Sequence, residues 1–235
     1  MPRRLLLFLL LAVVLAAACI RLGFWQLSRL AQRRARNSVV SARRAEPIVP
    51  ITTLHADSFS VLRRASISGT PDFDHEVVLA ARSYQGSPGV YLFTPMRLAG
   101  TDTAILVNRG WIYAPDGASV DLSRWRETGT RFVGYVELLP RGLSNTPDGV
   151  LRRDARIARE LNLVTVNSLL PYPVSSIYLL ATEQDTTKPM AERVARLPAP
   201  TLDEGPHLSY ALQWFAFAAI ALIGGAAVAI RGRTP

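Results

Sequence analysis

The sequence is poor in cysteine. Cys19 is the single cysteine among 235 residues, and it lies inside an apolar stretch. One thiol excludes an intramolecular disulfide, a CxxC redox pair and a cysteine-rich metal site. The sequence therefore gives no support to thiol exchange or to copper delivery through a cysteine pair.

Lysine is nearly absent as well. Lys188 is the one lysine among 27 basic residues, which face 18 acidic residues and give a net charge of +9. No nucleic-acid-binding motif accompanies this charge. The densest run of arginines, from Arg29 to Arg44, abuts a hydrophobic segment. We therefore expect anionic lipid headgroups, and not nucleic acid, to be the partner of these arginines.

The motifs of common enzymes are also missing. There is no GxSxG nucleophile elbow, no glycine-rich phosphate loop and no Ser/His/Asp constellation. His55 and His75 have acidic neighbours but lack HxxE or HxxxH spacing. Asp72, Asp74 and Glu76 alternate along the chain, a pattern that a solvated turn explains better than a divalent metal site. We predict that the protein is not an enzyme.

The first long apolar run, Leu5–Ile20, has 16 uncharged residues and allows two interpretations. The residues up to Cys19 resemble a lipoprotein cleavage site, which would make this cysteine a lipidated N-terminus. However, the apolar pattern continues past Arg21, whose long stem can reach toward headgroups. We favour a retained transmembrane helix over residues 5–27, with Trp25 in the interfacial belt.

A second apolar run, from Tyr210 to Ile230, contains 21 residues without formal charge and predicts a second transmembrane helix over residues 207–230. At about 100° per residue, one face of this helix is mostly small and carries His207, Ala211, Trp214, Ala218 and Gly225. That face can be an aromatic-lined slot for a planar ligand, with Tyr210 and Trp214 in the first turns. It can instead be a helix–helix packing face, and composition favours this second interpretation.

Residues 28–206 between the two runs read as one polar domain. Its Arg-rich start, residues 28–46, predicts a continuation of the first helix that lies on the membrane surface, and its Pro-rich end, residues 186–206, predicts an extended linker. Short alternating runs predict strands at residues 64–69, 76–82, 90–94, 103–113, 130–139 and 174–182, the second and third forming a hairpin. Asp154 is expected to cap a short helix that ends at Leu161.

The predicted fold is therefore an α+β membrane protein in which two transmembrane helices flank a mainly antiparallel β domain. Residues 1–4 and 231–235 would form short tails on the other side of the membrane. Within the domain, Arg109, Gly110 and Trp111 follow a buried strand. Gly110 permits a bulge or a close approach and Trp111 caps the core, or else Arg109 pairs with a carboxylate of a ligand or partner.

Three stretches occur in an informative order: Leu22–Leu30 after the first helix, Val107–Trp111 in the domain, and His207–Phe215 opening the second helix. Between them lie Arg82, Pro88-Gly89 and Thr94-Pro95. In this combination the chain strongly resembles the Surfeit locus protein 1 family, from about residue 5 to about residue 230. The resemblance implies an assembly factor for cytochrome c oxidase, with two transmembrane helices around an extracytoplasmic domain.

The resemblance also implies a cofactor and partners. Family members are described as helping haem a reach subunit I, the largest oxidase subunit, and this places the haem a synthesis machinery among the partners. Bacterial members are thought to bind the haem through the histidine that opens the second helix, which is His207 here. The family usually has Asn before this histidine, whereas Gly205-Pro206 precede it here, so the entry to the helix must differ.

Trp25, Arg29 and His207 are expected at similar depth in the membrane. They would supply an aromatic wall, a cation for the haem propionates and an axial imidazole, with Tyr210 and Trp214 beside them. The resemblance implies a multi-pass protein of the bacterial plasma (inner) membrane with its domain on the extracytoplasmic side. Arginine counts disagree: the tails hold four arginines, and residues 29–44 hold six, which by charge alone would place the domain inside.

Three hypotheses follow. The first is a haem-handling assembly factor with His207 as the ligand. The second is a scaffold that holds an oxidase subunit without binding haem, for which the strand end at residues 109–111 would matter. The third is a lipid-anchored envelope domain made by cleavage before Cys19.

Overall fold

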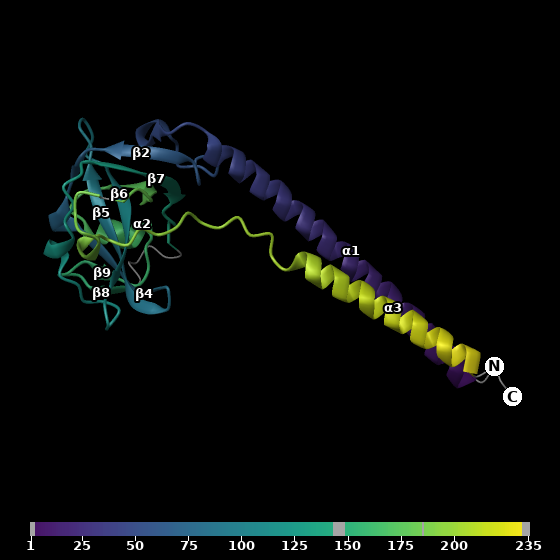
Figure 1. Ribbon diagram of the computed structural model, residues 1–235. Helices are drawn as coiled ribbons and strands as arrows, with labels where there is room; N and C mark the ends of the chain where they lie inside the picture. Colours follow the sequence, from purple (N-terminus) through teal and green to yellow (C-terminus); the bar gives the residue numbers. More distant parts are fainter. Residues whose placement is uncertain (1–2, 143–148, 185, 232–235) are drawn as a thin grey trace. The chain divides into compact units, whose positions relative to one another are not determined.

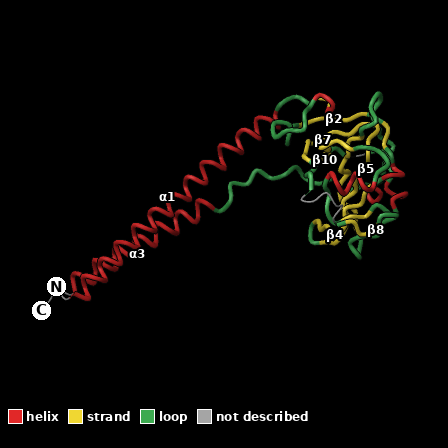
Figure 2. Tube along the Cα trace, turned by 180° about the vertical axis from the view of Figure 1, so that it is seen from behind, coloured by secondary structure: helices red, strands yellow, loops and turns green. Residues whose placement is uncertain are grey.

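The computed structural model describes residues 3–142, 149–184 and 186–231. The chain divides into two units: a helical unit, which comprises residues up to Ala42 and from Thr201 onward, and a domain, Arg43–Pro200. Figures 1 and 2 show the long helices of the first unit and the sheet of the second. The predicted tails are described only at Arg3, Arg4 and Arg231, since the other tail residues lie outside the described ranges.

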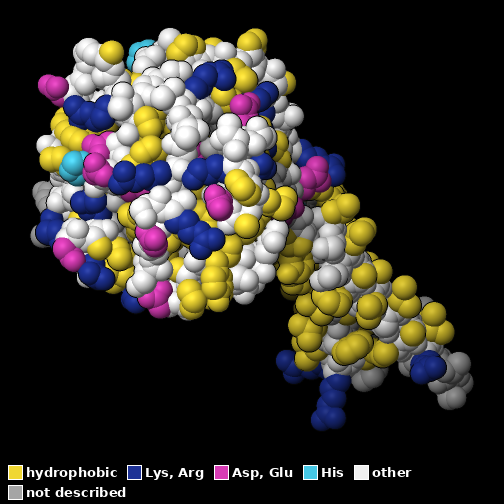
Figure 3. All heavy atoms as spheres, turned by 60° about the vertical axis from the view of Figure 1, so that its left-hand side comes forward, with side chains coloured by type: hydrophobic (Ala, Val, Ile, Leu, Met, Phe, Trp, Pro, Cys, Tyr) yellow, Lys and Arg dark blue, Asp and Glu magenta, His cyan; other side chains and the backbone are white. Residues whose placement is uncertain are grey.

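The helical unit consists of α1 (Arg3–Ala45) and α3 (His207–Arg231). Both helices are long and apolar enough to cross a membrane. Figure 3 shows hydrophobic side chains over most of their visible surface, whereas charged side chains of both signs are interspersed over the domain. The Arg-rich residues 28–45 continue α1 without a break, so the predicted helical continuation is present, and its position on the membrane surface stays a prediction.

The domain is built on one sheet, to which the described residues contribute ten strands. The strands are β1 (Val49–Pro50), β2 (Arg64–Ser68), β3 (Thr70–Pro71), β4 (Val77–Tyr84), β5 (Ser87–Arg97), β6 (Ala104–Tyr113), β7 (Arg131–Leu138), β8 (Val150–Arg152), β9 (Ile157–Ala158) and β10 (Val174–Ala181). One α-helix, α2 (Leu163–Leu169), lies between β9 and β10, and short 3₁₀ turns occur at Ile51–Thr53, Phe73–His75, Leu122–Trp125 and Met190–Glu192.

The strand order is β1-β2-β7-β10-β6-β5-β4-β9-β8, with β3 beside β5. The predicted hairpin is present as β4 and β5, and the strands expected near residues 64, 103, 130 and 174 are β2, β6, β7 and β10. The sheet is mixed, however, and the prediction of a mainly antiparallel sheet is corrected. β10 lies between β6 and β7, which run in opposite directions, so it must be parallel to one of them, and this is β6. β1 with β2 and β4 with β9 are the other parallel pairs.

Both faces of the sheet are covered, because successive side chains of a strand point to opposite faces. In β6, Ile105 and Val107 join one hydrophobic cluster, with Phe132 and Leu179, whereas Leu106 joins the other. The second cluster packs under α2 and includes Val166 and Leu169. Both sides of the central strands are therefore buried.

The helix predicted from Asp154 to Leu161 is wrong. That stretch contains a turn and then β9, and the helix begins nine residues later, at Leu163. Asn162 is the residue that caps it, because its side-chain oxygen accepts a hydrogen bond from the backbone N–H of Thr165 at 2.8 Å.

Candidate functional site

The two long helices pack against each other in opposite directions. His207 at the start of α3 contacts Gln26, whereas Gly225 near the end of α3 approaches Ala12 of α1. Their buried positions recur at steps of three, four or seven residues and are mostly small: Ala16, Cys19, Gly23 and Leu30 in α1, and Ala211, Ala218 and Gly225 in α3. A seven-residue period with small residues is typical of closely packed, gently supercoiled helices.

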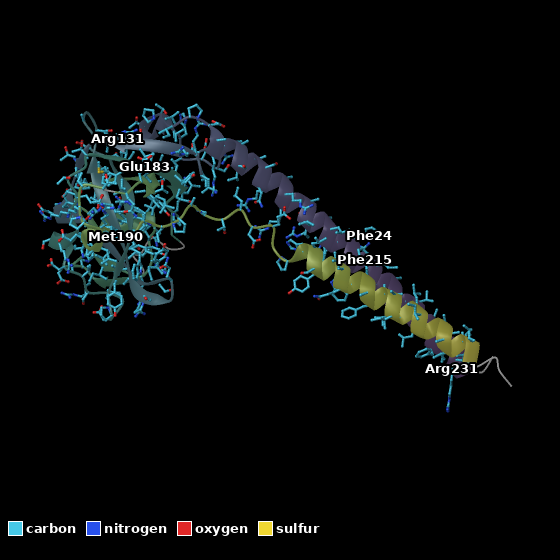
Figure 4. All side chains as sticks on the ribbon, viewed as in Figure 1. Phe24, Arg131, Glu183, Met190, Phe215 and Arg231 are labelled. Atoms are coloured by element: carbon cyan, nitrogen blue, oxygen red, sulfur yellow. The ribbon has the colours of Figure 1, made fainter. Side chains whose placement is uncertain are left out.

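This packing decides between the two interpretations of the small face of α3. Its residues Ala211, Ala218 and Gly225 are buried in the helix pair, so they are not available as a ligand slot. The helices also approach each other closely at Gly23, where a Cβ atom would lie 2.5 Å from the ring of Phe215. That ring also meets Phe24 edge-on, with 5.4 Å between ring centroids, and Figure 4 shows both phenylalanines at the line where the helices meet.

The turn before α3 sets the position of His207. Gly205 adopts φ +72°, a conformation that favours glycine, and its N–H donates to Asp203 Oδ1 at 2.8 Å. The carbonyl of Pro206 then accepts the first hydrogen bond of the helix, from the N–H of Tyr210 at 3.1 Å. A proline without an N–H suits this position because that donor would have no helical partner. The residues Gly205-Pro206 thus form a regular helix start.

Contacts with α1 hold the same segment in place. Arg34 forms a two-pronged ion pair with Glu204, with N–O distances of 2.9 and 3.0 Å. Asn37 Nδ2 donates to the carbonyls of Leu202 and Asp203, at 3.3 and 3.2 Å. The residues just before His207 are therefore fastened to the Arg-rich part of α1. The sequence analysis missed these contacts because they join residues about 170 positions apart.

His207 itself is half-buried and hydrogen-bonded. Its Nδ1 lies 2.8 Å from Gln26 Oε1. An amide oxygen only accepts hydrogen bonds, so this contact selects the tautomer with the proton on Nδ1 and leaves the lone pair on Nε2. A Cβ atom at residue 205 would lie 3.5 Å from Nε2, so Gly205 also keeps that nitrogen uncovered.

One flank of the helix pair carries the aromatic residues predicted near this histidine. At about 100° per residue, Tyr210, Trp214 and Phe217 fall beside His207 on α3. Trp214 is half-buried and meets Phe217 edge-on, with ring centroids 5.9 Å apart, whereas Tyr210 is exposed. The structure thus brings His207, Tyr210 and Trp214 to one flank.

Trp25 and Arg29 do not complete that flank. On α1, Trp25 lies about 100° away from Gln26 and shares a shallow groove with Ala17 and Arg21. The Arg29 guanidinium lies 6.0 Å from the Trp25 ring centroid and donates to Gln32 at 3.1 Å. Arg29 therefore turns toward Trp25, and the expected aromatic wall of Trp25 beside His207 stays a prediction.

The strand end at residues 109–111 has a structural explanation within the domain. Arg109 is fully buried; it donates to Glu76 at 2.5 Å and pairs with Glu127 at 3.2 Å. Glu127 pairs in turn with Arg196, at 2.6 Å, so the network holds two carboxylates and two guanidinium groups. Burial raises the pKa of Glu76, and Arg109 opposes that rise. The carboxylates that Arg109 contacts are internal, and not those of a haem.

Gly110 and Trp111 fasten the returning chain to β6. Gly110 adopts φ +123°, and a Cβ atom there would lie 2.2 Å from the carbonyl oxygen of Ala195. The backbones of Trp111 and Ala195 exchange two hydrogen bonds, of 2.8 and 3.0 Å. The expected close approach at Gly110 is thus present, and part of the predicted linker 186–206 is fixed to the sheet.

These features define the class of the protein: a mixed-sheet domain joined to a pair of packed helices, each long and apolar enough to cross a membrane. Within that class, the chain belongs to the SURF1 family, whose model matches residues 13–219. This match confirms the resemblance drawn from the sequence. The family is generally linked to the assembly of cytochrome c oxidase.

Relatives agree with this assignment along most of the chain. SURF1-like proteins of Rickettsia conorii and Rickettsia felis are each 25% identical to it over 206 residues, which is 85% of the chain and 81% and 86% of the relatives. A protein of Mycobacterium tuberculosis, named as an uncharacterized SURF1-like protein, is 25% identical over 206 residues, or 73% of its length.

Proposed function

We propose that the chain is an integral membrane assembly factor that helps deliver haem a to the largest subunit of cytochrome c oxidase. His207 is the residue that holds the haem in this proposal. The observation that carries it is the contact between His207 Nδ1 and Gln26 Oε1, at 2.8 Å. Metal-ligating histidines commonly donate their second ring N–H to such an acceptor, which fixes the tautomer and orients the ring.

The side chains around His207 fit a planar, largely apolar group. Nε2 is the nitrogen left with a lone pair, and Gly205 leaves space in front of it. Tyr210 and Trp214, on the same flank of α3, offer aromatic surface for such a group. Haem, when bound, would supply an iron, and the imidazole of His207 would be its protein ligand. Gln26 acts as a positioning residue, because it holds the imidazole and does not touch the haem.

The proposal includes a location and a reaction class. The protein is a multi-pass protein of the bacterial plasma (inner) membrane, its domain is extracytoplasmic, and it performs no catalysis of its own. Its partners are subunit I of the oxidase, the haem a synthesis machinery and membrane lipids. The buried thiol of Cys19, packed against Ala218, supports a retained first helix, and the intact mass of the mature protein tests it. Loss of the first 18 residues with an added acyl mass would contradict it.

The experiment compares haem content of the purified full chain with that of two histidine variants. We expect His207→Leu to lose bound haem a while its membrane insertion persists. His55→Leu, a change at an exposed histidine of the domain, is the matched control and should keep the haem. Gln26→Leu should weaken haem binding by roughly 10- to 100-fold, the usual cost of losing the group that orients a ligand. Stoichiometric haem in His207→Leu would overturn the proposal.

Reduced-minus-oxidised spectra of membranes that lack the chain test the role in the cell. The proposal predicts a selective loss of the a-type haem signal, with b- and c-type signals unchanged. Full oxidase assembly with His207→Leu would favour a scaffold that does not bind haem. Substitution of Arg109 is not a clean test of that alternative, because a fully buried ion-pair network depends on it.

A further inference from the structure

A cavity of about 580 Å³ lies on one face of the sheet in the domain, apart from His207. Its floor comes from five adjacent strands, β4, β5, β6, β10 and β7, and Leu161 and Leu197, which lie outside the strands, also line it. This volume falls in the range of pockets that bind small organic molecules.

The walls of the cavity are mostly apolar. Phe93 and Tyr178 meet edge-on at the floor, with ring centroids 5.5 Å apart, and Leu79, Tyr91 and Leu180 extend this surface. Most of these side chains belong to the same face as the cluster under α2, but α2 does not cover them fully, since Tyr91 and Tyr178 are only partly buried. An apolar ligand would remove this surface from water.

The charged groups of the cavity, Arg82 and Glu137, lie at its two ends, and the amide of Asn108 on β6 lies between them. Arg82 of β4 donates from Nη2 to the carbonyl of Arg159 at 2.6 Å, but its Nε is buried and has no hydrogen-bond partner among the described residues. Glu137 of β7 lies directly opposite Tyr178 in the sheet. Four strand intervals of about 4.8 Å separate β4 from β7, or roughly 19 Å along the sheet.

The two ends differ in charge. A buried N–H donor on a guanidinium group that lacks an acceptor is costly, and an anionic oxygen would satisfy it. At the other end, burial raises the pKa of the Glu137 carboxyl group, and Arg44 opposes the rise. The cavity therefore has a guanidinium group at one end, a carboxyl group at the other, and between them a mostly apolar floor that carries one amide, that of Asn108.

We propose that this cavity binds a single-chain amphipathic lipid, a long-chain fatty acid, with its carboxylate at Arg82 and its acyl chain along β5, β6 and β10 toward Glu137. The volume suits one chain and not a two-chain phospholipid. The unpartnered Nε of Arg82 selects the anionic head, and the aromatic floor takes the chain. The domain thus has a lipid site that is separate from the haem site proposed on the helices.

The test uses the full chain in lipid nanodiscs and palmitate that carries a photoreactive diazirine in its chain. Mass spectrometry of the labelled peptides should find the label on the floor strands β5, β6 and β10. Unlabelled palmitate should displace it, and hexadecanol, which has no anionic head, should compete at least tenfold less well. Competition by hexadecyl phosphate as strong as that by palmitate would show that the head is recognised as an anion and not as a carboxylate.

Variants separate binding from folding. Leu161→Trp and Leu197→Trp each place a larger side chain at a lining residue outside the strands, and each should reduce floor labelling at least tenfold. Arg82→Gln should weaken binding by roughly tenfold or more, the usual effect of losing a charged hydrogen bond. Arg152→Gln, at an exposed arginine outside the cavity, is the matched control and should leave it unchanged.

The proposal would be overturned if the label were found only on α1 and α3. It would also be overturned if both tryptophan variants left the labelling of the floor strands unchanged. Equal effects of Arg82→Gln and Arg152→Gln would overturn the assignment of the anionic head. Circular dichroism of each variant, together with unchanged background labelling of the helices, verifies that the chain is folded.

Discussion

The buried ion-pair network around Arg109 gives the sharpest prediction. Arg109→Met keeps much of the side-chain volume but removes the charge, and it leaves Glu76 buried without a cation in contact. Glu127 is less affected, because Arg196 still pairs with it at 2.6 and 2.9 Å. Glu76 therefore loses the cation that balances its charge, whereas Glu127 keeps one.

Removing one partner of a buried pair costs about 3–5 kcal/mol, because the remaining charge stays desolvated. We expect the lower part of this range, since Thr94 Oγ1 still donates to Glu76. The matched control is Arg126→Met, which breaks an exposed pair with Asp74, at 2.7 Å. Exposed pairs contribute about 0–1 kcal/mol, so the control should be nearly neutral.

Hydrogen exchange of the β6 amides measures this effect in the domain alone, without unfolding the helices. Opening of a core strand approaches the free energy of unfolding, so a loss of about 3–5 kcal/mol should speed exchange by roughly two to four orders of magnitude. Equal exchange rates in Arg109→Met and Arg126→Met would refute the reasoning, because buried and exposed pairs would then contribute alike.

The pH dependence supplies a second check on the same variant. Burial raises the pKa of Glu76 and Arg109 opposes the rise, so the folded-state pKa rises further when Arg109 is removed. The folded variant then binds the Glu76 proton more tightly than the unfolded chain does, and its stability falls as pH rises through that pKa. The penalty of Arg109→Met should therefore be larger at about pH 8 than at about pH 5. A stability penalty that does not change with pH would show that Arg109→Met does not leave Glu76 as a buried carboxylate without a cation.

Three further predictions concern packing and capping. Gly23→Leu should open the helix pair, because a Cβ atom there would lie 2.5 Å from the Phe215 ring. Labelling of Cys19 by N-ethylmaleimide in detergent should then become faster, and adding Phe215→Ala to the same chain should restore the slow labelling. Gly110→Ala should release the segment around Ala195 from β6, because residue 110 has φ +123° and its Cβ atom would lie 2.2 Å from the carbonyl oxygen of Ala195. Trypsin should then cleave faster after Arg193 or Arg196. Asn162→Ala should cost about 1 kcal/mol through the lost cap of α2, measured by urea unfolding; unchanged stability would mean that the cap is dispensable.

The elements with strong local signals could be predicted from the sequence. β4 and β5 follow from alternating apolar residues on either side of Gln85-Gly86, and the ends of α3 follow from Pro206 and the uncharged run after it. The short helix was misplaced because Asp154 and Asn162 are both capping residues. The choice between them depends on Ile157 and Ala158, which pair with β4 and so cannot be helical.

The candidate site was predicted in part. His207, Tyr210 and Trp214 follow from their position at the mouth of an apolar helix, and the structure places them on one flank. The role of Trp25 toward haem stays a prediction, because the direction in which Trp25 faces depends on which side of α1 meets α3, and this cannot be read along the chain. Arg109 was open to two interpretations, and its two carboxylate partners, 33 and 18 positions away in the chain, decide between them.

By itself, the sequence determined the two apolar helices, the strands of the domain between them, the family and the histidine that opens α3. These follow from local composition, period and motif. Only the tertiary structure decided that β10 enters between β6 and β7, that Gln26 holds His207 and that Arg109 faces internal carboxylates. Each of these depends on contacts between distant residues, for which many pairings are compatible with the same local pattern and packing selects one.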